Sequence, residues 1–166
     1  SRTVYLVSKN PDDTEYVLYE NTFDDEESIA DLKKTDASRF SVNDGKLVIT
    51  TTNTANSRIY MPDFLADFGN YNIETSAAML SSTDASRWFS ICYRAQNMQR
   101  TGANLRTPYI HMCVRKSMAT AGTSTTGGVE CVIANATGGW DYLKPTGYTE
   151  NMTYGTFYNI KVSAYN

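Results

Sequence analysis

The chain has 166 residues and carries 15 Lys and Arg against 18 Asp and Glu, which gives a formal net charge of −3. Such a chain offers no electrostatic attraction for nucleic acid or for an anionic membrane surface. No apolar run approaches the roughly 20 residues of a membrane span, so we expect no membrane insertion. The length fits one domain over residues 1–166, and the 12 Tyr favour β-structure.

Short runs rich in β-branched and aromatic residues recur along the chain, and turn residues bound each of them, as is typical of strands. In chain order they cover residues 3–7, 15–20, 39–42, 46–51, 58–61, 71–80, 87–94, 109–116, 129–134, 140–144 and 156–165. Between two of these runs lies Asn43-Asp44-Gly45, a strong hairpin signal. Only residues 24–34 resemble a helix, with acidic residues first and lysines last. We therefore predict an all-β chain with at most one short helix.

The order of several segments resembles the concanavalin A-like lectin/glucanase superfamily, which includes laminin-G-like and family-16-like modules. These segments are NTFDDEE, FSVNDGKLVIT, RWFSICYRAQN, YIHMCVRK and FYNIKVSAYN. The resemblance runs from Glu15 onward and implies an antiparallel two-sheet β-sandwich, a jelly-roll. Further strands usually follow the last segment in that superfamily, so this chain has either a shortened topology or is a fragment. An open sandwich would leave a hydrophobic edge unprotected, which favours a fragment whose last strands another polypeptide supplies.

Side chains alternate between the two faces of a strand, and this alternation predicts a polar face opposite the core. Apolar sets such as Ile110, Met112 and Val114 are expected to form the core. The opposite face bears the candidate ligand-binding residues Trp88, Arg94, His111, Arg115, Glu130 and Glu74, together with Asn159 and Lys161. Because sugar rings stack on aromatic faces and sugar hydroxyls pair with planar polar groups, this face indicates a carbohydrate site. Two arginines would suit an acidic glycan.

A second candidate platform is Trp140, an aromatic residue in a segment framed by glycines and a proline. Alternatives stay open for both candidates. A solvated antiparallel sheet also presents a polar face, with ion pairs between Arg94 or Arg115 and Glu130 or Glu74. Trp140 equally fits the opening of a strand that closes one end of the sandwich.

Acidic residues between positions 20 and 27 directly follow a predicted strand. Carboxylates and backbone carbonyls are the ligands that Ca²⁺ prefers, so Glu20 and Asp24 are candidate ligands of a structural calcium ion. A solvated charge run is the alternative. Cys92, His111 and Cys113 share one predicted face, but they lack the standard spacing of a zinc site, and cysteines of this kind usually serve in packing.

The resemblance also raises catalysis, because family 16 glycoside hydrolases carry an E-x-D-x-x-E strand. No segment here matches that motif, and Glu74 and Glu130 are the only carboxylates that we propose for a catalytic pair. We therefore expect a non-catalytic, lectin-like module that binds a polysaccharide and belongs to a larger secreted or cell-surface protein. The alternatives are a glycoside hydrolase of the same fold and a structural or adhesive domain that packs against a neighbouring domain.

Overall fold

The computed structural model describes residues 4–9, 15–51, 57–95, 109–116, 128–134, 140–143 and 151–165. Across these ranges the chain forms ten strands and three short 3-10 turns. Every pair of neighbouring strands is antiparallel, which confirms the prediction of an all-β, antiparallel chain. No helix in the described ranges is long and apolar enough to cross a bilayer.

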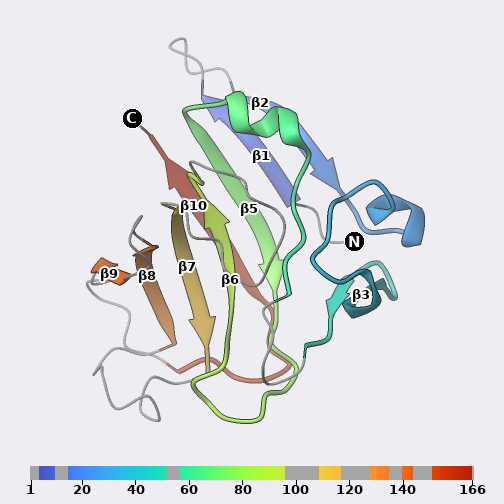
Figure 1. Cartoon of the computed structure of the whole chain (residues 1–166), viewed down its shortest axis with the longest axis vertical. Coiled ribbons are helices and arrows are strands. Elements are labelled where there is room, and N and C mark those ends of the chain that lie inside the picture. Colours follow the sequence, from blue (N-terminus) through green and yellow to red (C-terminus); the bar gives the residue numbers. More distant parts are fainter. Residues whose placement is uncertain are drawn as a thin grey trace. The chain divides into compact units, whose positions relative to one another are not determined.

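The chain divides into two compact units, and each contains one four-stranded sheet. The first unit comprises residues 1–77 and 158–166, and the second comprises residues 78–157. In the first unit the strand order is β10-β5-β1-β2, and Figure 1 shows β5 between β10 and β1. These strands are β10 (Tyr158–Ala164), β5 (Tyr71–Ala77), β1 (Val4–Lys9) and β2 (Glu15–Asn21).

The predicted hairpin is present in the first unit as β3 (Phe40–Val42) and β4 (Leu47–Ile49). Asn43 and Lys46 exchange backbone hydrogen bonds, with N···O distances of 2.9 and 3.1 Å. Asp44 and Gly45 between them have φ angles of 52° and 64°. Positive φ at both central residues is what a type I′ turn requires, and Asp-Gly adopts it at low cost.

Residues 24–34, where at most one short helix was predicted, form one 3-10 turn, η1 (Glu26–Ile29), with Asp25 as its N-cap. The Lys34 ammonium donates hydrogen bonds to the carbonyls of Ile29 and Leu32, so a side chain satisfies carbonyls that a longer helix would pair with backbone amides. Apolar residues in and around this segment form a hydrophobic core cluster. Its buried members are Phe23, Ile29, Leu32 and Phe40, and Val42, Leu47, Ile59 and Met61 pack against them.

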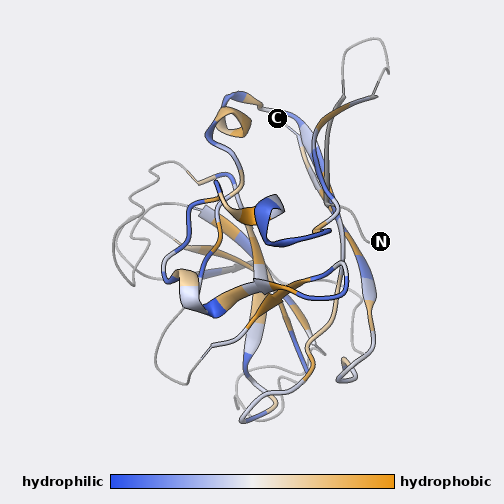
Figure 2. Ribbon diagram, turned by 90° about the vertical axis from the view of Figure 1, so that its right-hand side faces the viewer, coloured by the Kyte–Doolittle hydropathy of each residue, from blue (hydrophilic) through white to orange (hydrophobic). Residues whose placement is uncertain are grey.

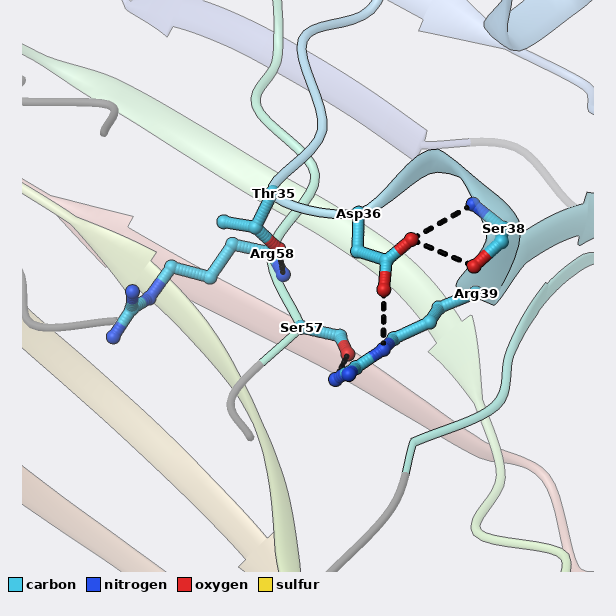
Figure 3. Close-up of polar contacts among 6 residues, drawn as sticks. All are labelled: Thr35, Asp36, Ser38, Arg39, Ser57 and Arg58. Carbon is cyan, nitrogen blue, oxygen red and sulfur yellow. Dashed lines mark hydrogen bonds and ion pairs between the residues drawn. The ribbon is translucent and has the colours of Figure 1, made fainter. Parts of the chain in front are cut away.

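The strand predicted at residues 58–61 is wrong, because this segment makes a single β-bridge, between Ile59 and Lys34. The Tyr60 amide donates to the Lys33 carbonyl at 2.9 Å, and the Thr35 amide donates to the Arg58 carbonyl at 3.0 Å. Beyond the bridge the chain turns at Asp36 into η2 (Ala37–Arg39), and Figure 3 shows this turn. A third 3-10 turn, η3 (Asp63–Asp67), follows the bridge.

The second unit contains a sheet with the strand order β6-β7-β8-β9. Its strands are β6 (Trp88–Tyr93), β7 (Tyr109–Arg115), β8 (Val129–Ala134) and β9 (Trp140–Leu143). In Figure 2 hydrophobic and hydrophilic residues both occur along the strands, as expected where the two faces of a sheet differ. This sheet carries most of the residues proposed for the ligand-binding face.

Candidate functional site

The register of β6, β7 and β8 brings four of the predicted site residues onto one face of the sheet. Trp88 lies opposite Arg115, and Cys113 lies opposite Glu130. Because side chains two residues apart share a face, His111 belongs to the same set. The predicted grouping of Trp88, His111, Arg115 and Glu130 therefore agrees with the strand register.

The prediction of which face is buried is wrong for β8 and for β7 as far as Met112, whereas Val114 is buried as expected. His111 and Glu130 are only 3% and 8% exposed. Ile110 and Met112, which were expected in the core, are half-buried. Alternation along a strand shows which residues share a face, but it does not show which face is covered. The polar residues tolerate burial here because they contact one another.

The alternative reading of an ion pair between Arg115 and Glu130 is confirmed, although the pair is buried rather than solvated. The Arg115 Nη2 donates to Glu130 Oε2, and both side chains are about nine-tenths buried. Arg115 Nε is sealed from solvent and has no hydrogen-bond partner within the described ranges. The Arg115 amide donates to the Gly128 carbonyl at 2.7 Å. A Cβ at Gly128 would lie 2.2 Å from the Arg115 carbonyl oxygen, so this close approach of two chain segments requires glycine.

His111 connects the buried part of this face to Trp88. Its ring contacts those of Trp88 and Tyr109 edge to face, with both centroid distances at 5.5 Å. Its Nδ1 lies 3.2 Å from the Cys113 sulfur. Burial raises the pKa of the Cys113 thiol to about 12, so this sulfur stays protonated at neutral pH. The imidazole is thus contacted by three residues, one of which is Trp88.

Trp88 is the exposed member of the set, with 41% of its surface accessible. A compact turn immediately precedes it. The Asp84 carboxylate accepts a hydrogen bond from the Ser86 amide at 2.9 Å and pairs with Arg87 Nε at 3.0 Å. The Ser86 hydroxyl also donates to this carboxylate, and these hydrogen bonds lower the pKa of Asp84. Trp88, the first residue of β6, therefore directly follows a turn in which the charges of Asp84 and Arg87 neutralise each other.

This turn occurs twice in the chain, which our reading of the sequence missed. Residues 35–39 and residues 83–87 both read Thr-Asp-Ala-Ser-Arg, and an aromatic residue that begins a strand follows each of them. In the first copy, drawn in Figure 3, Asp36 accepts from the Ser38 amide at 3.1 Å and pairs with Arg39 Nε at 2.9 Å. The aspartate pKa is lowered in this copy too, chiefly by the serine hydroxyl. Identical pentapeptides are visible in the sequence alone, so this signal was available.

The remaining predicted ligand-binding residues lie elsewhere. Arg94 follows the end of β6 with a φ of 57°, so the alternation of that strand does not extend to it. Glu74 belongs to β5 in the other unit, where it pairs with Lys161 at 2.6 Å, and Asn159 lies on the adjacent strand β10. Trp140 begins β9 opposite Ala134, which fits its alternative role as the opening of a strand. The position of the Trp140 side chain lies outside the described part of the structure.

The predicted calcium ligands lie in an acidic segment in which several carboxylates already accept hydrogen bonds from the protein. Glu20 is exposed on β2, and Asp24 accepts a hydrogen bond from the Thr22 hydroxyl at 2.6 Å. Asp25 caps η1, and Glu26 accepts from the Val42 amide at 2.7 Å. In the part of the chain that the structure describes, no group of three or more His, Cys, Asp or Glu residues is placed to hold a metal ion. A calcium site therefore stays a prediction.

The chain was compared with models of known protein families, with curated proteins and with solved structures. The resemblance to the concanavalin A-like superfamily, the secreted or surface location and the larger parent protein stay predictions. None of the three comparisons found a match.

Proposed function

We propose that this chain binds carbohydrate without catalysing a reaction, and that Trp88 is the platform on which a sugar ring stacks. The observation that carries the proposal is that Trp88 is 41% exposed and that its indole makes an edge-to-face contact with the buried ring of His111. The C–H face of a pyranose packs well on such a ring. A ring that is already fixed loses little conformational entropy when the ligand binds, which favours affinity.

In this proposal the buried polar residues support the platform, and the exposed ones contact the sugar. His111 touches Trp88 directly, and the Arg115–Glu130 pair lies on the neighbouring strands of the same face. Arg87 precedes Trp88 in the chain, and its side chain is 55% exposed. Its guanidinium can donate several hydrogen bonds to hydroxyl oxygens. Of the residues predicted as direct ligands, His111, Arg115 and Glu130 thus become positioning residues in this proposal, and Trp88 stays a direct ligand.

The ion pairs support a non-catalytic role. A retaining glycoside hydrolase needs one carboxylate to attack the sugar and a second carboxyl group to donate a proton. Of the two candidate carboxylates, Glu130 is engaged by Arg115 and Glu74 by Lys161. They also belong to different sheets. Because each carboxylate is held in an ion pair, we expect neither to act as a nucleophile or as a proton donor.

A glycan array tests the proposal directly. The array is probed with the wild-type chain, with Trp88→Ala and with Phe64→Ala, which removes a comparably exposed aromatic ring from η3 in the other unit. We expect Trp88→Ala to weaken binding at least about tenfold and Phe64→Ala to leave it unchanged. Far-ultraviolet circular dichroism shows that each variant is folded. The proposal fails if the wild-type chain binds no glycan, or if folded Trp88→Ala binds as tightly as wild type.

A second candidate function is that of a structural or adhesive domain, and exposed apolar residues on β2 favour it. Tyr16 and Val17 are both more than half exposed, and β2 pairs only with β1 among the strands described. An edge strand with exposed apolar side chains can take up a strand from another chain. Light scattering over a range of concentrations, with Val17→Lys as the disrupting variant, tests for self-association through this edge.

A further inference from the structure

The two Thr-Asp-Ala-Ser-Arg turns hold their arginines in the same way but present them to different surroundings. In the first copy the guanidinium has an additional partner, because Arg39 Nη1 donates to the Ser57 hydroxyl at 3.1 Å (Figure 3). The aromatic residue that follows, Phe40, is 6% exposed and belongs to the core cluster. This copy shows which surroundings complement the motif: a hydroxyl oxygen at the guanidinium and apolar groups against the ring.

In the second copy both groups are open to solvent. The Arg87 side chain is 55% exposed, against 22% for Arg39. Trp88 is 41% exposed, against 6% for Phe40. Within the described ranges, Asp84 is the one side-chain partner of Arg87. Among the residues that the structure describes, none contacts the second copy in the way that a hydroxyl group and apolar side chains contact the first.

Charge around the second copy argues against an anionic ligand. The positive charge of Arg87 is matched by Asp84 at 3.0 Å, and that of Arg115 is matched by Glu130. A carboxylate or sulfate group that accepted a hydrogen bond from Arg87 would lie close to the Asp84 carboxylate, and the two like charges would repel each other. A hydroxyl group needs only an available N–H donor and brings no charge. Of the two arginines expected to suit an acidic glycan, Arg94 and Arg115, Arg115 is already paired with Glu130.

We infer that Arg87 and Trp88 form one subsite for a neutral sugar, whose ring stacks on the indole while one hydroxyl oxygen accepts a hydrogen bond from the Arg87 guanidinium. The inference rests on the proposed function, and it adds the class of ligand and the residue that selects it. Asp84 is the positioning residue of the subsite, because it fixes the guanidinium through Nε and neutralises its charge.

The test compares binding to neutral and acidic polysaccharides that differ only in charge, such as polygalacturonate before and after reduction of its carboxyl groups. The same array also contains neutral glucans, mannans and xylans. Calorimetry then measures the dissociation constant for the strongest ligand with wild type, Arg87→Gln and Arg87→Lys. We expect binding to a neutral glycan that changes less than about twofold between about 50 and about 500 mM NaCl. Arg87→Gln should weaken it by about tenfold, and Arg87→Lys, which keeps the charge but loses the planar fork, should be intermediate.

Two charge variants test whether the carboxylate of Asp84 excludes acidic ligands, because its removal should then create new binding. Asp84→Asn leaves Arg87 unmatched and should give the chain salt-sensitive binding to the acidic polymer. The control Asp63→Asn removes the partner of Lys33 from an exposed ion pair in the other unit, and it should not create binding to the acidic polymer. Binding that depends on Trp88 but is restricted to acidic glycans would overturn this inference and leave the proposed function standing. An Arg87→Gln variant that binds like wild type overturns the role of Arg87, and a wild-type chain that binds no glycan overturns both proposals.

Discussion

Removing one partner of the buried Arg115–Glu130 pair should be among the most destabilising single changes on the β6–β9 sheet. Both side chains are about nine-tenths buried, so Glu130→Leu leaves a guanidinium that is enclosed and uncompensated. Loss of one partner from such a pair costs about 3–5 kcal/mol of folding free energy. For a chain of this length, this corresponds to a fall of roughly 10 °C in the unfolding temperature.

The double variant Arg115→Met/Glu130→Leu distinguishes two quantities. One is the net contribution of the ion pair to the free energy of unfolding, and the other is the cost of leaving one buried partner unpaired. Arg115 Nε has no hydrogen-bond partner in the described part of the chain, so the native pair is incompletely satisfied. We therefore expect the double variant to be about as stable as wild type, or more stable. Urea unfolding of wild type, both single variants and the double variant gives the complete cycle. A cost below about 1 kcal/mol for Glu130→Leu would show that the pair is not buried as described.

Three further changes have outcomes that the structure determines. Gly128→Ala places a methyl group against the Arg115 carbonyl and should cost about 1–3 kcal/mol in urea unfolding; an unchanged midpoint would contradict the close approach. Burial raises the pKa of Cys113 from 9.0 to about 12, so the stability that depends on the protonated thiol is complete below pH 9 and is lost as the pH rises toward 12. Urea midpoints between pH 8 and pH 11 should accordingly fall less steeply in Cys113→Ala, and equal slopes would refute the assignment. Lys161→Ala removes an ion pair that is about half exposed and should cost less than about 1 kcal/mol, measured in the same way, with a larger loss indicating a buried role.

The strands could largely be predicted from the sequence, because their signals are local. The Asn-Asp-Gly hairpin followed from the φ angles that these residues tolerate, and the structure shows that turn. The strand predicted at residues 58–61 failed because its β-branched and aromatic residues meet only a short partner segment. That segment turns away at Asp36, whose side chain bonds the Ser38 amide. Propensity gives the tendency of a segment, but a strand also needs a partner of matching length.

The candidate site could be predicted only in part, for a different physical reason. Periodicity placed Trp88, His111, Arg115 and Glu130 on one face, and the register agrees. Periodicity could not show that this face is the more deeply buried one, because burial of charged groups depends on partners in other strands. The role that we propose for Arg87 was missed because the strand was predicted from residue 87, and alternation then puts Arg87 and Trp88 on opposite faces, whereas β6 begins only at Trp88. The repeated pentapeptide was the signal that would have singled out Arg87.

The repeated turn also bears on the order in which the chain acquires structure. The main hydrogen bonds and the ion pair within each turn join residues at most three positions apart. Closing so short a loop costs little chain entropy, and it occurs far faster than the pairing of distant strands. Both β3 and β6 begin at the residue directly after such a turn. Nascent turns at these two places in the denatured ensemble would therefore fix where two strands start before either has found its neighbour.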